Sequence, residues 1–292
     1  LPEMTNRHCL PLVCRRWRDL LASPAAAALW SDLHVAPVPR SLPDYDAIVA
    51  GMYRWMLRHA GGVRRLQLML DETDAPDTHA VLALVGARLR ELKIVVEPWL
   101  EVPNRRLALL ALAPRLTSLA LKMNVRRDQL AALELPPTLR SLALAVDDGG
   151  VESLPRCLAR LTELASLAVD NARLSPETAL PTTLTKLDLR MHYQARLPAA
   201  ISALARLQQL AVTCYDADEE DEEDGVATNF EVLAPLAASL RHLDVTGSLG
   251  AAVPAEIGAL TGLTRLVLDD NGRLGAGDAS LAALSTLRCL AH

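Results

Sequence analysis

The sequence predicts an α/β fold in which short parallel strands recur along the chain, joined by turns and short helices. Two observations carry this prediction: a leucine pattern that is repeated over most of the length, and a near absence of aromatic residues. The 292 residues are 51% apolar and 22% charged but only 3% aromatic, and 58 of them are Leu. Most globular cores take much of their packing area from aromatic rings. We therefore expect the core of this chain to consist mainly of leucine side chains.

The leucine pattern is Leu-x-x-Leu-x-Leu, with Val or Ile tolerated. It occurs nine times and begins a tenth time at Leu287. The central leucines are 20–27 residues apart, with one longer step of 33 residues. Such spacing is typical of repeats in which each unit is one strand followed by a segment that leads back to the start of the next strand. Because alternate side chains of a strand point to opposite faces, the second and third leucines point into the core. The central positions are Leu66, Leu92, Leu119, Leu142, Leu167, Leu187, Leu210, Leu243 and Leu266.

The segments that return from one strand to the next fall into two types. Residues 154–161, 197–204 and 253–260 share a Pro followed by a short stretch of small and apolar residues. Pro suits the first turn of a helix, so we expect short helices in these three segments. Residues 135–139 and 180–184 are tighter, and we expect turns there.

Over residues 61–292 these patterns resemble those of leucine-rich repeat proteins. The resemblance implies a solenoid, or horseshoe, with a curved parallel sheet inside and turns and short helices outside. In that family an Asn after each strand usually bonds the backbone of the turn. Asn124 and Asn271 match it, and Asp71, Asp147 and Ser248 are candidates to replace it in other copies.

The N-terminal residues Leu-Val-Cys-Arg-Arg-Trp-Arg, followed by Leu-Trp-x-x-Leu, resemble the second half of an F-box. Val13, Trp17 and Leu20 lie on one face at helical spacing. The resemblance implies a partial helical F-box over residues 1–35, which docks on the Skp-type adaptor of a cullin–RING ubiquitin ligase. The first helix of that module has no counterpart between Glu3 and Leu10. The adaptor-binding residues that the resemblance implies are Leu12, Val13, Cys14, Trp17, Leu20, Leu29 and Trp30.

A further helix is predicted over residues 44–59, where Ile48, Met52, Trp55 and Met56 form one apolar face. Gly61 and Gly62 end it. We expect this helix to cover the exposed end of the first coil, as a terminal cap does in repeat proteins. The predicted organisation is thus a partial F-box (1–35), a linker and capping helix (36–62) and the repeats (63–292).

The repeats contain an acidic insertion at 216–224, where eight of nine residues are Asp or Glu. The insertion accounts for the step of 33 residues, and without it the formal net charge would change from −5 to +3. Its sixth residue is Asp221, where a calcium-binding EF-hand loop requires Gly. Two interpretations stay open: a solvated surface loop, or an electrostatic contact for a basic partner.

Several function classes find no support in the sequence. Cys9 lies beside His8 without the rest of a catalytic triad, and the Gly272 region lacks the Lys of a phosphate loop. His and Cys are not at zinc-ligand spacing, so we expect no metal and no cofactor. There is no broad basic stripe for nucleic acid and no apolar run long enough for a membrane. Five scattered cysteines indicate a reducing compartment: the cytoplasm, with the nucleus or the cytoskeleton as alternatives.

We expect a protein target on the concave sheet face, because repeat arrays bind their partners there. The outward strand positions predict a basic patch, a middle lined by alanine, and an acidic far end. The alanines either leave room for side chains of the target or merely reflect an Ala-rich composition. The predicted partner-binding residues are Lys93, Lys122, Ala143, Ala168, Asp188, Arg190, Asp244 and Asp269.

The sequence therefore predicts a non-catalytic protein-binding module. With the F-box resemblance, it predicts the substrate-receptor subunit of a cullin–RING (SCF-type) ubiquitin ligase. The alternative is a leucine-rich repeat scaffold or adaptor without a ligase role, for example in a cytoskeletal or ciliary assembly. An enzyme is the third hypothesis, against which the lack of a nucleophile–base pair argues.

Overall fold

The computed structural model divides the chain into two compact units. The first contains the described residues up to Met123 together with Glu134–Leu139, and the second contains residues 130–133 and those from Arg140 onward. We describe each unit by itself. The residues that the structure describes are 31–37, 41–70, 77–96, 108–123, 130–146, 151, 154–172, 174–175, 177–192, 196–215, 229–249, 252–272, 274, 281–287 and 289.

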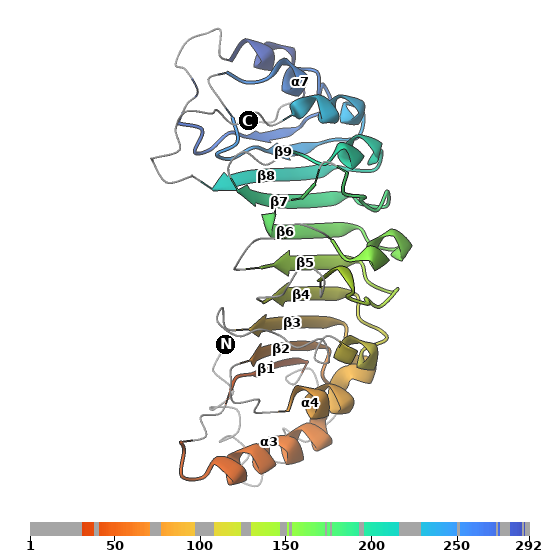
Figure 1. Ribbon diagram of the computed structural model, residues 1–292, viewed down its shortest axis with the longest axis vertical. Coiled ribbons are helices and arrows are strands. Elements are labelled where there is room, and N and C mark those ends of the chain that lie inside the picture. The colour runs from red at the N-terminus through yellow and green to blue at the C-terminus, as the bar shows by residue number, and fades with distance from the viewer. Residues whose placement is uncertain are drawn as a thin grey trace. The chain divides into compact units, whose positions relative to one another are not determined.

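The first unit holds four parallel strands in the order of the sequence (Figure 1). They are β1 (Asp32–Val35), β2 (Arg65–Leu70), β3 (Glu91–Val96) and β4 (Ser118–Lys122). The connecting helices are α3 (Tyr45–His59), α4 (Thr78–Val85), η2 (Gly86–Arg88) and η3 (Ala108–Leu112), where η denotes a 3₁₀-helix.

The second unit holds six parallel strands, also in sequence order. They are β5 (Ser141–Ala145), β6 (Ser166–Ala172), β7 (Lys186–His192), β8 (Gln209–Tyr215), β9 (His242–Asp244) and β10 (Arg265–Val267). The helices are η4 (Arg156–Arg160), η5 (Ala199–Ala203), η7 (Phe230–Leu236), α7 (Ala255–Gly258) and η8 (Ala282–Thr286). Short helices thus occur in all three predicted segments, each directly after its Pro. Residues 135–139 and 180–184 are turns, as expected.

The strand register aligns the repeats leucine by leucine. In the first unit Leu66 lies opposite Leu92, which lies opposite Leu119. In the second unit the central leucines from Leu142 to Leu266 are likewise paired from strand to strand. From Leu66 to Leu243 these central leucines are at most 2% exposed. The α/β fold with parallel sheets is therefore confirmed, and each unit has the strand-and-return organisation of leucine-rich repeats.

Backbone hydrogen bonds fix each coil on the preceding one. The amides of Thr117 and Ser118 both donate to the Arg90 carbonyl oxygen, at 2.8 and 3.0 Å, and the Thr117 hydroxyl donates to the same oxygen at 3.1 Å. In the second unit Thr264 bonds the Arg241 carbonyl oxygen in the same way, through its amide (2.8 Å) and its hydroxyl (3.0 Å). Three donors on one carbonyl hold the start of the strand in register.

At the C-terminal ends of the strands, polar side chains also bond each coil to the preceding one. The Asn271 amide group donates to the Val245 carbonyl oxygen of the preceding coil (2.9 Å). The Ser248 hydroxyl, which is fully buried, donates to the Val212 carbonyl oxygen (2.7 Å). The structure thus confirms the turn role of Asn271 and the replacement by Ser248. Asn124, Asp71 and Asp147 lie outside the described residues.

Asn171 is a turn residue that the sequence pattern missed. It has a positive φ of 56°, which Asn tolerates better than most residues. Its side-chain amide donates to the Val146 carbonyl oxygen (2.8 Å). The β6–β7 register shifts between Val169 and Ala172, so this Asn takes the turn role one residue ahead of the place that the repeat pattern gives.

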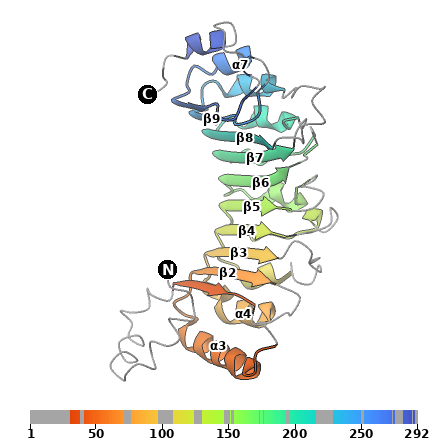
Figure 2. The same ribbon diagram turned by 90° about the vertical axis from the view of Figure 1, so that its left-hand side faces the viewer.

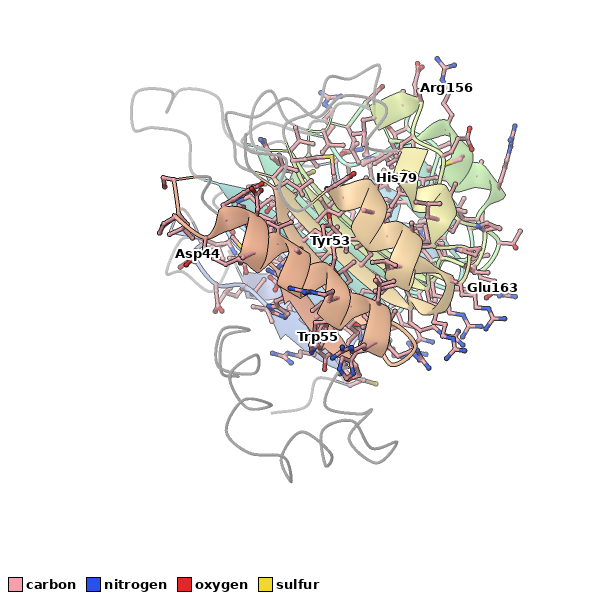
Figure 3. All side chains as sticks on the ribbon, turned by 90° about the horizontal axis from the view of Figure 1, so that it is seen from below. Asp44, Tyr53, Trp55, His79, Arg156 and Glu163 are labelled. Atoms are coloured by element: carbon pink, nitrogen blue, oxygen red, sulfur yellow. The ribbon has the colours of Figure 1, made fainter. Side chains whose placement is uncertain are left out.

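Helix α3 confirms the helix predicted over 44–59. It lies at the β1 end of the first unit, beside α4 (Figures 1 and 2), and Figure 3 shows Tyr53 and Trp55 along it. Met52 and Met56 are buried, and the rings of Trp55 and His59 lie against each other in a tilted arrangement, with centroids 4.9 Å apart. Ile48, however, is 43% exposed, so the apolar face is narrower than predicted.

One feature differs from the predicted organisation. Residues 32–35 belong to strand β1 and not to a helical segment that runs to residue 35: Leu33 and Val35 are buried and pair with Leu66 and Leu68. The physical reason is that Trp30, Leu33 and Val35 have the spacing of the repeat itself. The repeats predicted over 63–292 are shared between the two compact units.

Leu187 tests the packing of the coils, because it is fully buried between neighbouring strands. We expect Leu187→Ala to lower the free energy of unfolding by about 2–5 kcal/mol, through lost burial and the cavity left behind. Lys186→Ala on the same strand is the control, since Lys186 is exposed and surface changes cost within about 0.5 kcal/mol. Urea denaturation measures both. Equal effects of the two substitutions would contradict this packing.

Candidate functional site

In each unit the residues between the buried leucines form the sheet face opposite to the core, because of the pleat of the strands. All of them have solvent access. In the first unit they are Gln67, Lys93 and Ala120, and in the second unit they are Ala143, Ala168, Asp188, Ala211, Asp244 and Val267.

The two predicted basic residues of the first unit lie close together. Lys93 pairs with Ala120, and Lys122 pairs with Val95 on the same two strands. The lysines are therefore diagonal neighbours on β3 and β4, within about 8 Å by their backbone positions. Both are exposed.

The other predicted residues lie in the second unit. We call the exposed side of strands β5 to β9 the second-unit face. Its residues are Ala143, Ala145, Ala168, Asp170, Asp188, Arg190, Ala211 and Asp244. Asp269, which follows β10, is also exposed.

Alanines form one side of the second-unit face. Ala143 lies directly opposite Ala168, and Ala145 lies opposite Asp170. With one carbon per side chain, the strand backbone is the floor of the face here, and side chains of a bound molecule can approach it closely. The predicted alanine-lined region is thus present on β5 and β6.

The carboxylate of Asp188 is half-buried on β7. Burial raises the pKa of its carboxyl above the ordinary value of 3.8. The cations Arg190 and Lys186 oppose this shift, and the carboxylates of Asp244 and Asp170 add to it. The net upward direction means that loss of solvent outweighs the two neighbouring cations.

The other charged residues of the second-unit face are held by local contacts. The Asp244 carboxylate accepts hydrogen bonds from the Thr246 amide (3.1 Å) and the Thr246 hydroxyl (2.6 Å). The Asp170 carboxylate accepts a hydrogen bond from the backbone amide of Asn171 (3.0 Å) and lies 3.8 Å from the Arg190 guanidinium. These contacts fix the carboxylates in place before any partner binds.

The predicted acidic far end is in fact of mixed charge. Lys186, Gln209, His242 and Arg265 are aligned in register across β7 to β10, one residue before the central leucines. Lys186 and Arg265 therefore place positive charge beside the carboxylates of Asp188 and Asp244. The prediction used only the positions after the central leucines, and the missed signal lay in the residue before each of them.

His242 is not a third fixed cation. Burial lowers the pKa of its imidazole, and Arg265 lowers it further. Asp244 acts in the opposite direction without reversing the shift. We therefore expect this side chain to be neutral at neutral pH.

The other candidate sites contribute little chemistry. The thiol of Cys157 is buried and donates to the Leu133 carbonyl oxygen (3.0 Å). Burial raises the pKa of the Cys214 thiol, which disfavours a nucleophilic thiolate. Within the described ranges, no three His, Cys, Asp or Glu side chains come together as a metal site. The same part of the chain has no helix that could span a membrane.

Some predicted residues lie outside the described residues, and the structure does not test them. They are the adaptor-binding residues Leu12, Val13, Cys14, Trp17, Leu20, Leu29 and Trp30, the His8–Cys9 pair, and the acidic insertion at 216–224.

Comparison with known proteins gives the chain no family. No protein-family model matches it, for the F-box or for any other family, and no curated protein matches it. Among solved structures, it is similar to a leucine-rich repeat (LRR) protein of Leptospira interrogans, with 14% identity and a TM-score of 0.37, over 92% of this chain and 86% of that one. At these values the similarity assigns no function, and the repeat organisation rests on the registers above.

The raised pKa of Asp188 predicts a pH dependence of stability. The folded state binds the proton of the Asp188 carboxyl more tightly than the unfolded state does, because its pKa is raised. The protein therefore loses stability as the pH rises from the unfolded pKa of 3.8 to the higher folded pKa. We therefore expect Asp188→Asn to become more stabilising, relative to the natural chain, between pH 3 and neutral pH. Urea denaturation across this range measures it.

The control for this experiment is Asp269→Asn, at an exposed position. The difference between the control and the natural chain should change little with pH. A similar trend in both variants would mean that the effect comes from net charge and not from burial of Asp188.

Proposed function

We propose that this chain is a non-catalytic protein-binding module whose target lies on the second-unit face. The observation that carries the proposal is the half-buried carboxylate of Asp188, on a face with no other described element over it. Burial of a charge costs stability unless something offsets it. A bound cationic group would offset that cost at Asp188.

The arrangement around Asp188 indicates which group of the target binds there. Ala211 lies between Asp188 on β7 and Asp244 on β9. The Cα atoms of Asp188 and Asp244 are therefore about 9.6 Å apart, two strand spacings, and the side chain between them is only a methyl group. A Lys or Arg side chain of the target fits above Ala211, where both carboxylates can bind it.

Rigid strands favour such binding. The side chains sit on hydrogen-bonded strands, and Thr246 already orients the Asp244 carboxylate. Little conformational entropy is then lost when the target binds. The alanines of β5 and β6 offer a second place where target side chains approach the sheet.

We further propose that this target is a substrate of a cullin–RING (SCF-type) ubiquitin ligase, and that this chain is the substrate-receptor subunit. The support for this part is the F-box resemblance of residues 10–33 alone. The ligase chemistry would then belong to other subunits, and a Skp-type adaptor would be the second partner.

The alternative is a scaffold or adaptor without a ligase role. Two observations favour it: the sequence lacks the first helix of the F-box between Glu3 and Leu10, and no F-box family model matches the chain. In this case the second-unit face has the same role, and the adaptor does not bind.

Ala168→Arg tests the second-unit face, because a long side chain on β6 would block a target from the sheet. The control is Ala159→Arg, the same change at an exposed position of η4. We expect proteins that are captured from cell extract by the natural chain to be lost with Ala168→Arg and kept with Ala159→Arg. Mass spectrometry compares the three samples. Loss only with Ala159→Arg would place the target on the helical side instead.

Trp17→Ala separates the two biological roles. If the chain is a ligase subunit, the full chain should bind a purified Skp-type adaptor, and Trp17→Ala should weaken binding by at least about tenfold, or 1.4 kcal/mol, through loss of a large apolar contact. Trp99→Ala is the same change outside the F-box-like residues and should have little effect. Calorimetry or a pull-down measures this. No binding by the natural chain would favour the scaffold.

A further inference from the structure

Four arginines form a cluster in the first unit, which we call the arginine cluster: Arg64, Arg88, Arg90 and Arg115. Arg88 and Arg115 directly precede the first leucine of their repeats, and Arg64 and Arg90 directly follow that position. The Arg90 amide donates to the Arg64 carbonyl oxygen at 2.8 Å, so these two lie on adjacent coils, about 4.8 Å apart. All four side chains are exposed.

Two of these guanidinium groups converge on one backbone oxygen. The Gly61 carbonyl, just after α3, accepts a hydrogen bond from Arg64 Nη1 (2.9 Å) and from Arg88 Nη1 (3.1 Å). Two like charges are therefore held next to each other by a neutral group. Each guanidinium has five N–H donors, and most of them still face solvent.

No carboxylate of the described residues neutralises the arginine cluster. In this part of the chain, the ion pairs of arginine join Arg65 to Asp32, Arg140 to Glu163 and Arg190 to Asp170.

The second unit shows the contrast. Arg140 directly follows the first leucine of its repeat, as Arg90 does, and Glu163 directly precedes the first leucine of the next, as Arg115 does. There the two side chains form an ion pair of 3.0 Å. In the first unit the corresponding positions hold Arg90 and Arg115, so two positive charges lie where the second unit has an ion pair.

We propose that the arginine cluster is a second interaction site, which binds an acidic segment of a partner protein, rich in Asp and Glu. The planar fork of each guanidinium matches a carboxylate with two hydrogen bonds. The four arginines are spread over three coils, so several carboxylates along a peptide suit them better than one compact anion.

A protein segment also suits the cluster better than nucleic acid. The arginine cluster is confined to four residues on neighbouring coils. A long polyanion would extend well beyond these four arginines and gain no further contacts with them. A short acidic segment would not.

The test uses the full chain and a fluorescent peptide with the sequence of residues 216–224, Asp-Ala-Asp-Glu-Glu-Asp-Glu-Glu-Asp. Anisotropy at low ionic strength measures binding. We expect the double variant Arg90→Gln/Arg115→Gln to weaken binding at least about tenfold. Within the described residues neither of these side chains makes a hydrogen bond or ion pair, so the fold should be kept, which circular dichroism verifies.

The matched control is Arg156→Gln/Arg160→Gln, which removes the same charge from two exposed arginines of η4. Figure 3 shows Arg156 pointing away from the helix. We expect this control to bind the peptide as the natural chain does. Equal weakening by both double variants would overturn the proposal, since net charge alone would then explain binding. An unchanged affinity of Arg90→Gln/Arg115→Gln would overturn it as well.

Three further arms define the ligand. A peptide in which Asn and Gln replace Asp and Glu should not bind. A nine-nucleotide oligothymidine should bind more weakly than the acidic peptide, and tighter binding would contradict a protein partner. The peptide should also bind the chain in which Gly and Ser replace residues 218–224, where no acidic insertion competes.

This site does not depend on the proposed function, because it lies in the first unit and shares no residue with the second-unit face. The Ala168→Arg variant should therefore keep full affinity for the acidic peptide. If Ala168→Arg loses the proteins captured from cell extract but still binds the peptide, the two sites are separate. If Arg90→Gln/Arg115→Gln loses the peptide but still captures those proteins, the same conclusion follows.

Discussion

The structure depends on one constraint: each coil buries its leucines only against the coils beside it. A single strand and its return are too small to enclose an apolar side chain, so neighbours must align leucine with leucine. The register achieves this, for example from Leu142 through Leu167 to Leu187. Forked hydrogen bonds onto one carbonyl, such as that of Arg90, keep the alignment at the start of each strand. The core and the surface both follow from this stacking.

The same stacking turns sequence positions into rows on the surface. A residue at a given place in the repeat lies one strand spacing from its counterpart, whatever the two residues are. Asp188 and Asp244 thereby flank Ala211 on the second-unit face, and Arg64 comes next to Arg90 in the first unit. Substitutions in these rows change the binding chemistry without disturbing the core. The chain can thus present the carboxylates of Asp188 and Asp244 on one unit and the arginine cluster on the other.

Polar side chains at the strand ends allow the repeats to differ in length. Asn271 and Ser248 occupy the expected turn position and bond the preceding coil. Where the spacing to the next repeat drops to 20 residues, between Leu167 and Leu187, the strand bulges and Asn171 takes over this role in a left-handed conformation. At this irregular copy the Asn171 side chain still bonds the preceding coil, at the Val146 carbonyl oxygen.

The sequence by itself determined the α/β repeat, the strands from Leu66 to Leu266, the helix over 44–59 and the outward positions from Lys93 to Asp244. These follow from local periodicity, which a single strand or helix already displays. The tertiary structure decided the rest: the division into two units, the raised pKa of Asp188, the basic row beside it and the convergence of Arg64 and Arg88 on Gly61. Each of these depends on residues from different coils, whose proximity is set by stacking and not by spacing along the chain. The F-box segment stays a prediction from the sequence.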